Sequence, residues 1–140
     1  MRMLVSVVAL LCVIFTVGCE HGDGKDGGGA GLEGTSWRLA SWSAGSPDPS
    51  KYTITAAFSE SQISGTSAVN SYGGSYSAKA DGSFAVDELV STEIAGSPDA
   101  MRAESTYMSL LQAARKYAVN DASLTLMDGS GRDLLVFHPP

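Results

Sequence analysis

The clearest strand pattern in the chain is Tyr52-Thr53-Ile54-Thr55-Ala56-Ala57-Phe58. Tyr52, Ile54, Ala56 and Phe58 fall on every second position, so in an extended chain they point to one face. The two threonines between them suit a pleated, half-buried surface, as β-branched residues do. We therefore predict a β-strand here, with one face in a hydrophobic core.

Stretches with the same period lie on both sides of this strand. Thr35–Trp42 alternates, with Trp37 and Leu39 on one face. Ser59-Glu60-Ser61 predicts a turn into a partner strand around Gln62–Val69. These stretches predict antiparallel neighbours, because short turns join strands that run in opposite directions.

The alternating pattern continues towards the C-terminus, at residues 84–92, 124–126 and 134–137. Asp81-Gly82 is a turn signal before the first of these stretches, and Asp128-Gly129-Ser130-Gly131 separates the other two. The last stretch, Leu-Leu-Val-Phe, is apolar at successive positions, which predicts a strand buried on both faces.

One segment has helical spacing instead. Ser97 suits an N-cap, Pro98 the first helical position, and Asp99 the positive end of the helix dipole. Arg115 and Lys116 complement the other end. The apolar residues between form one stripe: Ala100, Ala103, Tyr107, Leu110, Leu111, Ala114 and Ala118. Because the stripe has no basic flank, we expect it to pack on the sheet and not on a membrane.

The sequence therefore predicts a mainly β (α+β) fold. Many short antiparallel strands and one helix favour a small barrel-like sheet with the helix packed on it, because such sheets curl to protect their edges. The chain has 140 residues, which suits one compact domain. The residues 70–76 carry Gly73-Gly74 between two tyrosines, and we interpret them as a tight turn or bulge flanked by strand ends.

The charge balance argues against one class of partner. The chain has 9 basic and 15 acidic residues and a formal charge of −6. No lysine or arginine cluster is present, so we expect no nucleic-acid partner. The excess of acid indicates a solvated, soluble surface.

Residues 1–18 predict a secretory signal peptide. Arg2 gives a positive start, and Met3–Val17 is apolar but shorter than the roughly 20 residues that a transmembrane helix needs. Thr16-Val17-Gly18-Cys19 resembles a bacterial lipobox, in which the cysteine is lipidated and becomes N-terminal, although a lipobox favours Leu where Thr16 stands. Cys12 follows a bulky leucine and fits less well. We predict lipidation at Cys19; the alternative is a secreted protein with a chance cysteine.

Residues 19–31 continue as a tether. Glycine and aspartate dominate Glu20–Gly31, and apolar periodicity is absent. Such a segment predicts a flexible linker that spans roughly 20 Å. The predicted organisation is a signal peptide over 1–18, the lipidated cysteine and tether over 19–31, and a folded domain over 32–140.

Candidate catalytic groups are few. His21 lies in the tether and His138 lies two residues from the end, so neither a zinc site nor a serine triad is expected. Asp87, Glu88 and Glu93 could form an acid/base pair, but acids in such numbers are more often exposed surface charges. Glu104 lies beside the helical stripe, where a helix-surface or capping role is favoured over a functional one. We predict no catalytic residue, no metal and no cofactor.

An ordered set of motifs resembles the META domain family, whose members are HslJ-like. Leu32-Glu33-Gly34-Thr35-Ser36-Trp37-Arg38-Leu39 fits its opening pattern L-x-G-T-x-W-x-L. The segment 65–76 is similar to the family's G-x-x-G-C-N-x-Y-x-G-x-Y. The likeness continues at the following places: Phe58, Ser91-Thr92-Glu93, Met101-x-x-Glu104-x-x-Tyr107-x-x-x-Leu111, Leu124-x-Leu126 and Leu134-Leu135-Val136-Phe137.

The resemblance implies a lipocalin-like barrel with one helix, in an envelope protein linked to stress or resistance and without an established catalytic activity. Asn70, Tyr72, Gly74 and Tyr76 are the motif residues carried over. They form a candidate loop with either a structural or a binding role. Many members carry a cysteine at the position of Val69 and another near Gly96. This chain has neither, which is coherent if the two normally bond to each other.

We therefore expect a non-catalytic, lipid-anchored protein of the cell envelope, in the periplasm or on the outer membrane. It would bind an unknown protein or small-molecule partner, or support stress tolerance, and it is expected to be a monomer. The alternative is an inhibitor of an envelope-targeting enzyme such as a lysozyme or protease, an analogy that rests on the fold alone.

Overall fold

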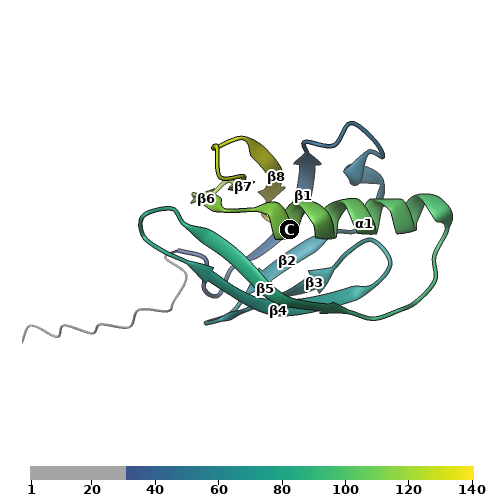
Figure 1. Cartoon of the computed structure of the whole chain (residues 1–140), viewed down its shortest axis with the longest axis horizontal. Coiled ribbons are helices and arrows are strands. Elements are labelled where there is room, and N and C mark those ends of the chain that lie inside the picture. The colour runs from purple at the N-terminus through teal and green to yellow at the C-terminus, as the bar shows by residue number, and fades with distance from the viewer. Residues whose placement is uncertain (1–30) are drawn as a thin grey trace, which may run out of the picture.

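Eight strands and one long helix make up the part of the chain that the computed structural model describes, residues 31–140 (Figure 1). The predicted signal peptide, the predicted lipidation at Cys19, His21 and nearly all of the predicted tether lie outside these residues. The elements in chain order are β1 (Ser36–Trp42), the 3-10 helix η1 (Pro49–Lys51), β2 (Thr55–Phe58), β3 (Gln62–Thr66), β4 (Ser71–Ala78), β5 (Phe84–Ser91), α1 (Pro98–Ala113), β6 (Lys116–Val119), β7 (Leu124–Met127) and β8 (Asp133–His138).

All eight strands belong to one antiparallel sheet. The strand order is β5-β4-β3-β2-β1-β8-β7-β6. The pairing of β1 with β8 brings the last strand beside the first, with Leu39 opposite Phe137. The edge strands β5 and β6 approach each other at a bridge between Ser83 and Lys116. The sheet is therefore curled and barrel-like but not closed, and α1 crosses its open side (Figure 1).

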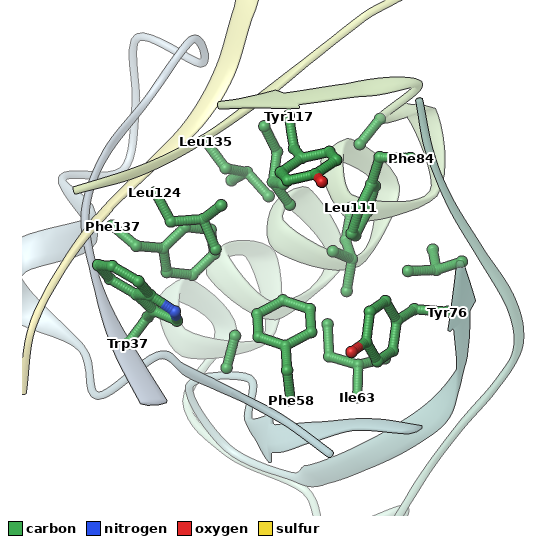
Figure 2. Close-up of a cluster of buried hydrophobic side chains, with 14 of the residues drawn as sticks. Trp37, Phe58, Ile63, Tyr76, Phe84, Leu111, Tyr117, Leu124, Leu135 and Phe137 are labelled. Carbon is green, nitrogen blue, oxygen red and sulfur yellow. The ribbon is translucent and has the colours of Figure 1, made fainter. Parts of the chain in front are cut away.

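The strands form where the alternation predicts them. Trp37 and Leu39 in β1 are buried, as are Ile54, Ala56 and Phe58 in and before β2. In β8 both Leu134 and Leu135 are buried, which fits a strand covered on both faces. Figure 2 shows the inward-pointing side chains of this core, where Phe58 packs edge-on against Tyr76 at 4.9 Å between ring centroids. Fully burying such side chains stabilises the fold by about 1.5–3 kcal/mol each.

The helix begins where the capping residues predict. Ser97 accepts a hydrogen bond from the backbone N of Ala100 at 3.3 Å, and Pro98 is the first residue of α1. The helix is shorter than the apolar stripe predicts. It ends at Ala113, and Ala118 belongs to β6, a strand that the sequence did not indicate. Arg115 donates to the carbonyl oxygens of Gln112 and Ala114, both at 2.7 Å, and so caps the helix end.

Candidate functional site

The candidate loop is a strand in the structure. Asn70 ends the turn after β3, and Tyr72, Gly74 and Tyr76 lie within β4, which runs unbroken through Gly73-Gly74. Of the two interpretations of residues 70–76, the tight turn is therefore wrong and the bulge is confirmed. The irregularity lies in the pairing with β5, where the register shifts between Gly73 and Ser75. It is a β-bulge, and it includes Glu88, a non-glycine residue with a φ of 53°.

Close approach of the bulge explains Gly74. A Cβ at this position would lie 2.8 Å from the carbonyl oxygen of Asp87 and 3.0 Å from the side chain of Leu89. Gly74 does not have a positive φ, so the site does not use the conformational freedom of glycine at this position. The glycine makes room for the neighbouring strand.

The two tyrosines of β4 are structural groups. Tyr72 donates a hydrogen bond to the carbonyl oxygen of Thr55 at 2.8 Å, and its hydroxyl lies 2.6 Å from that of Tyr107 in α1. Tyr76 donates to the carbonyl oxygen of Ser59 at 2.7 Å. Burial raises the pKa of Tyr72 and of Tyr107 above the usual value. Both phenols therefore remain neutral donors that join β4 to its neighbours.

Asn70 is the centre of a buried polar network. Its side-chain oxygen accepts from the backbone N of Ile94 at 2.7 Å and from the Thr92 hydroxyl at 2.8 Å. Its Nδ2 donates to the carbonyl oxygen of Ile94 at 3.2 Å and to Glu104 Oε1 at 2.7 Å. An amide side chain has two donor hydrogens and two acceptor positions, so Asn70 uses all of them. It holds Ile94 as a neighbouring strand would, through both backbone groups.

Glu104 is buried, contrary to the helix-surface or capping role favoured from the sequence. Its side chain is 8% exposed, and it reaches from α1 to the turn before β4. Its Oε2 accepts from the Ser67 hydroxyl at 3.1 Å and from the backbone N of Val69 and of Asn70, at 3.2 and 2.8 Å. Its spacing was a usable signal, because Tyr107 and Leu111 follow at i+3 and i+7 on the buried face.

Hydrogen bonds stabilise the ionised form of the Glu104 carboxyl. Burial would raise the pKa of its carboxyl, but hydrogen bonds from Asn70, Ser67 and Val69 outweigh burial and lower the pKa. Among residues 31–140, ion pairs link Arg102 with Asp99 and Arg132 with Asp128, and none involves Glu104. Glu104 is thus an ionised carboxylate without a neighbouring cation in the described part of the chain.

The segment that follows β5 lies over this network. Gly96 packs on Val69, so that a Cβ built on Gly96 would be 3.5 Å from the Val69 Cβ and 2.7 Å from its Cγ2. Two cysteines at these positions would have their Cβ atoms at disulfide distance, which is about 3.5–4.5 Å. In this chain Val69 and Gly96 therefore stand in contact at the two positions where other members carry the cysteines.

The remaining acidic candidates lie on the surface. Asp87, Glu88 and Glu93 are exposed, on β5 and just after it. His138 is exposed at the end of β8. Within residues 31–140, no three His, Cys, Asp or Glu residues are grouped so that they could hold a metal ion. No helix among the same residues is long and apolar enough to cross a membrane.

The hollows on the surface of residues 31–140 include the following two. The larger, about 440 Å³, lies beside Trp37, Val119, Asn120 and Pro139. The smaller, about 290 Å³, lies between the segment that follows β5 and the first turns of α1. The smaller one is lined by residues of the network and of that segment: Asn70, Ser91, Thr92, Glu93, Ile94, Ala95, Met101 and Glu104.

Solved structures support the fold. An NMR structure of a protein from Burkholderia xenovorans is 26% identical, with a TM-score of 0.64 over 78% of this chain and 83% of that one. A second NMR structure is 19% identical, with a TM-score of 0.59 over 78% and 92%. The crystal structure of a duf4847 family protein from Bacteroides vulgatus is 11% identical, with a TM-score of 0.60 over 76% and 93%. No curated protein matches the sequence.

The sequence profile of the META domain matches residues 30–140, which is nearly all of the chain that the structure describes. The match spans the opening motif around Trp37, the strand that carries Tyr72 and Tyr76, and the helix that carries Glu104. The chain therefore belongs to the META domain family.

Proposed function

We propose that this protein is a lipid-anchored, non-enzymatic protein of the cell envelope that presents its META domain to a binding partner or supports envelope stress tolerance. The observation that carries the non-enzymatic part of this proposal is the hydrogen bonding of Glu104. A catalytic acid or base needs a carboxyl whose pKa lies near the working pH, usually raised by burial. Glu104 is instead held ionised by four hydrogen bonds that link α1 to the turn before β4.

The other buried polar groups support the same proposal. In residues 31–140, every buried side-chain nitrogen and oxygen has a hydrogen-bond partner. Ser67 and Asn70, the buried polar residues beside Glu104, bond within the network. These groups fix the domain's shape, as expected of a rigid scaffold whose surface does the work.

The N-terminal sequence supports the proposed anchor. A positive start, a short apolar stretch and the Gly18-Cys19 pair support export and lipidation, and the Gly-rich segment after Cys19 would separate the domain from the lipid. One acyl chain binds a membrane only marginally, so stable anchoring requires more than one chain on this cysteine.

Membrane fractionation and intact mass of the native protein test the anchor. We expect the wild type in the membrane fraction, with a diacylglyceryl-sized addition on Cys19, and Cys19→Ser without either. Cys12→Ser is the matched control and should behave as wild type. A soluble, unmodified wild-type protein would contradict the anchor. A hydrolytic activity that is lost in Glu104→Gln, in protein that remains folded, would contradict the non-enzymatic role.

A further inference from the structure

The C-terminal half of β5 and the segment after it form an edge of the sheet. β5 is an edge strand with β4 on one side. On its other side, backbone contact with β6 and the residue before it lies at the start of β5, where Phe84 donates its backbone N–H to the carbonyl oxygen of Arg115 at 2.9 Å and Ser83 forms a bridge with Lys116. From Leu89 in the bulge to the end of β5 at Ser91, the strand has no second strand neighbour in residues 31–140. An exposed edge of this kind offers backbone groups to another extended chain.

Two large apolar side chains are exposed along this edge. Val90 is 69% exposed and Ile94 is 60% exposed, and they are the exposed large hydrophobic residues of the described chain. Ile94 is not a mobile loop residue, because the Asn70 amide binds both its backbone N–H and its carbonyl oxygen. The network therefore holds an apolar side chain in place at the surface, which lowers the entropy cost of binding to it.

The charged side chains of the segment that carries this edge have one sign. The segment 87–101 contains Asp87, Glu88, Glu93 and Asp99 and no basic residue. The next base, Arg102, is engaged with Asp99 at 3.3 Å. The hollow of about 290 Å³ beside Ile94 adds the ionised Glu104, whose Oε1 accepts one hydrogen bond among the described residues. A carboxylate oxygen has two acceptor positions, so one remains for a basic donor.

We propose that β5 from Leu89 to Ser91, with the segment Thr92–Gly96, docks an extended segment of a partner protein in which basic and apolar side chains alternate. The partner strand adds to the free edge of β5. Its apolar side chains cover Val90 and Ile94, and a lysine or arginine enters the hollow towards Glu93 and Glu104. This assignment rests on the proposed binding function and names the chemistry of the partner.

Charge selects this occupant over a second copy of the chain. Two β5 edges paired about a two-fold axis would bring Asp87, Glu88 and Glu93 of one copy against the same carboxylates of the other. Like charges juxtaposed in an interface disfavour it, whereas lysines and arginines in the same place favour association. The carboxylates thus disfavour self-association through this edge and favour pairing with a basic strand.

Titration of the full chain in detergent micelles with synthetic peptides tests the proposal. The probe is a seven-residue peptide that alternates lysine with valine. One control peptide has glutamate in place of each lysine, and the other has alternate backbone nitrogens methylated so that it cannot pair with a strand. We expect the probe to bind with a dissociation constant below about 1 mM and to shift backbone amide NMR signals of residues 89–96 and 101. The control peptides should not bind.

Matched variants locate the site. Val90→Ser with Ile94→Ser, and separately Glu93→Lys, should weaken binding of the probe at least about ten-fold, because each removes one of the recognised features. Glu60→Lys, in the turn between β2 and β3, makes the same charge change elsewhere and should leave binding unchanged. Unshifted signals of Leu111 and Phe137 show that each variant keeps its core.

Several outcomes would overturn the assignment. They are equal binding of the glutamate peptide, shifts that map outside residues 89–96 and 101, absence of binding, and dimerisation of the peptide-free chain through the same residues. The proposed binding function is tested separately from its assignment to this edge. A photo-crosslinker that captures a membrane-associated partner from position 60 and not from position 94 would keep the binding role and exclude this edge.

Discussion

The Glu104 carboxylate binds Asn70 twice, through different atoms. Its Oε1 accepts the Asn70 side-chain amide at 2.7 Å, and its Oε2 accepts the Asn70 backbone N–H at 2.8 Å. The two residues are 34 positions apart, so this contact joins α1 to the turn that starts β4. Because Asn70 also holds Ile94, one carboxylate fixes the helix, the turn and the exposed segment after β5.

Replacing Asn70 by Asp tests this contact. The substitution keeps the shape but puts a second carboxylate beside Glu104, where the amide donated a hydrogen bond. An uncompensated buried charge of this kind costs about 3 kcal/mol or more in the free energy of unfolding. Urea unfolding at pH 7 measures the loss. Acidification should reduce the difference from wild type, because protonation of one of two adjacent carboxyls removes their repulsion.

Asn120→Asp is the matched control for that substitution. Asn120 is exposed, and its side-chain oxygen accepts from the backbone N of Ala122 and Ser123, contacts that an aspartate can also make. Its effect on stability should therefore be small. If Asn70→Asp were as stable as Asn120→Asp, the network would not hold the domain together.

The lowered pKa of Glu104 predicts the pH dependence of stability. The folded state binds the Glu104 proton less readily than the unfolded state, whose carboxyl titrates near the usual 4.5. Stability from this group is therefore complete above that value and is lost as the pH falls through the lower folded pKa. Urea midpoints of wild type and Glu104→Gln, measured between pH 7 and pH 3, should differ most at pH 7 and converge in acid.

At pH 7, Glu104→Gln should lose about 2–3 kcal/mol of stability, because charge-assisted hydrogen bonds are replaced and an amide NH₂ then faces backbone donors. Glu60→Gln removes an exposed charge and serves as the control, with the pH profile of wild type. Parallel pH profiles for wild type and Glu104→Gln would show that another group governs acid unfolding.

The sequence predicts the frame of this fold better than its polar centre. Alternation and turn residues indicate β1, β2 and β8 because the period of a half-buried strand is local information. The sequence pattern does not indicate β6, because this strand is four residues long and follows the helix after a two-residue connection. The hydrogen-bond partners of Glu104 lie 34 to 37 positions away in the sequence. The sequence alone therefore does not distinguish this buried carboxylate from an ordinary surface charge. The sequence around Gly74 does not show why a glycine is needed there, because the bulge that crowds it lies on another strand.

The hydrogen bond between the Tyr72 and Tyr107 hydroxyls predicts that Tyr72→Phe and Tyr107→Phe lower the free energy of unfolding by different amounts. Tyr72 donates to the carbonyl oxygen of Thr55, so the bond between the two hydroxyls has Tyr107 as its donor. Tyr107→Phe removes one hydrogen bond and should cost about 1 kcal/mol. Tyr72→Phe also leaves the fully buried Tyr107 hydroxyl without its acceptor and should cost about 2–3 kcal/mol. Urea unfolding of both variants measures the order, and equal losses would contradict the donor assignment.

The packing of Gly96 on Val69 predicts an engineered disulfide. Val69→Cys with Gly96→Cys, in a Cys12→Ser, Cys19→Ser background, removes the valine methyl groups that a Cβ at 96 would strike and leaves the two Cβ atoms about 3.5 Å apart. The bond would close a loop of about 28 residues, which restricts the unfolded chain and should add about 3 kcal/mol relative to the reduced form. Intact mass and urea unfolding, with and without reductant, measure formation and gain. Gly96→Cys alone is the control, and it should be less stable than its parent because Val69 still occupies the space. If the double variant remained reduced under oxidising conditions, residues 69 and 96 would not be in contact in solution, and the segment that carries Ile94 would not be held against the turn.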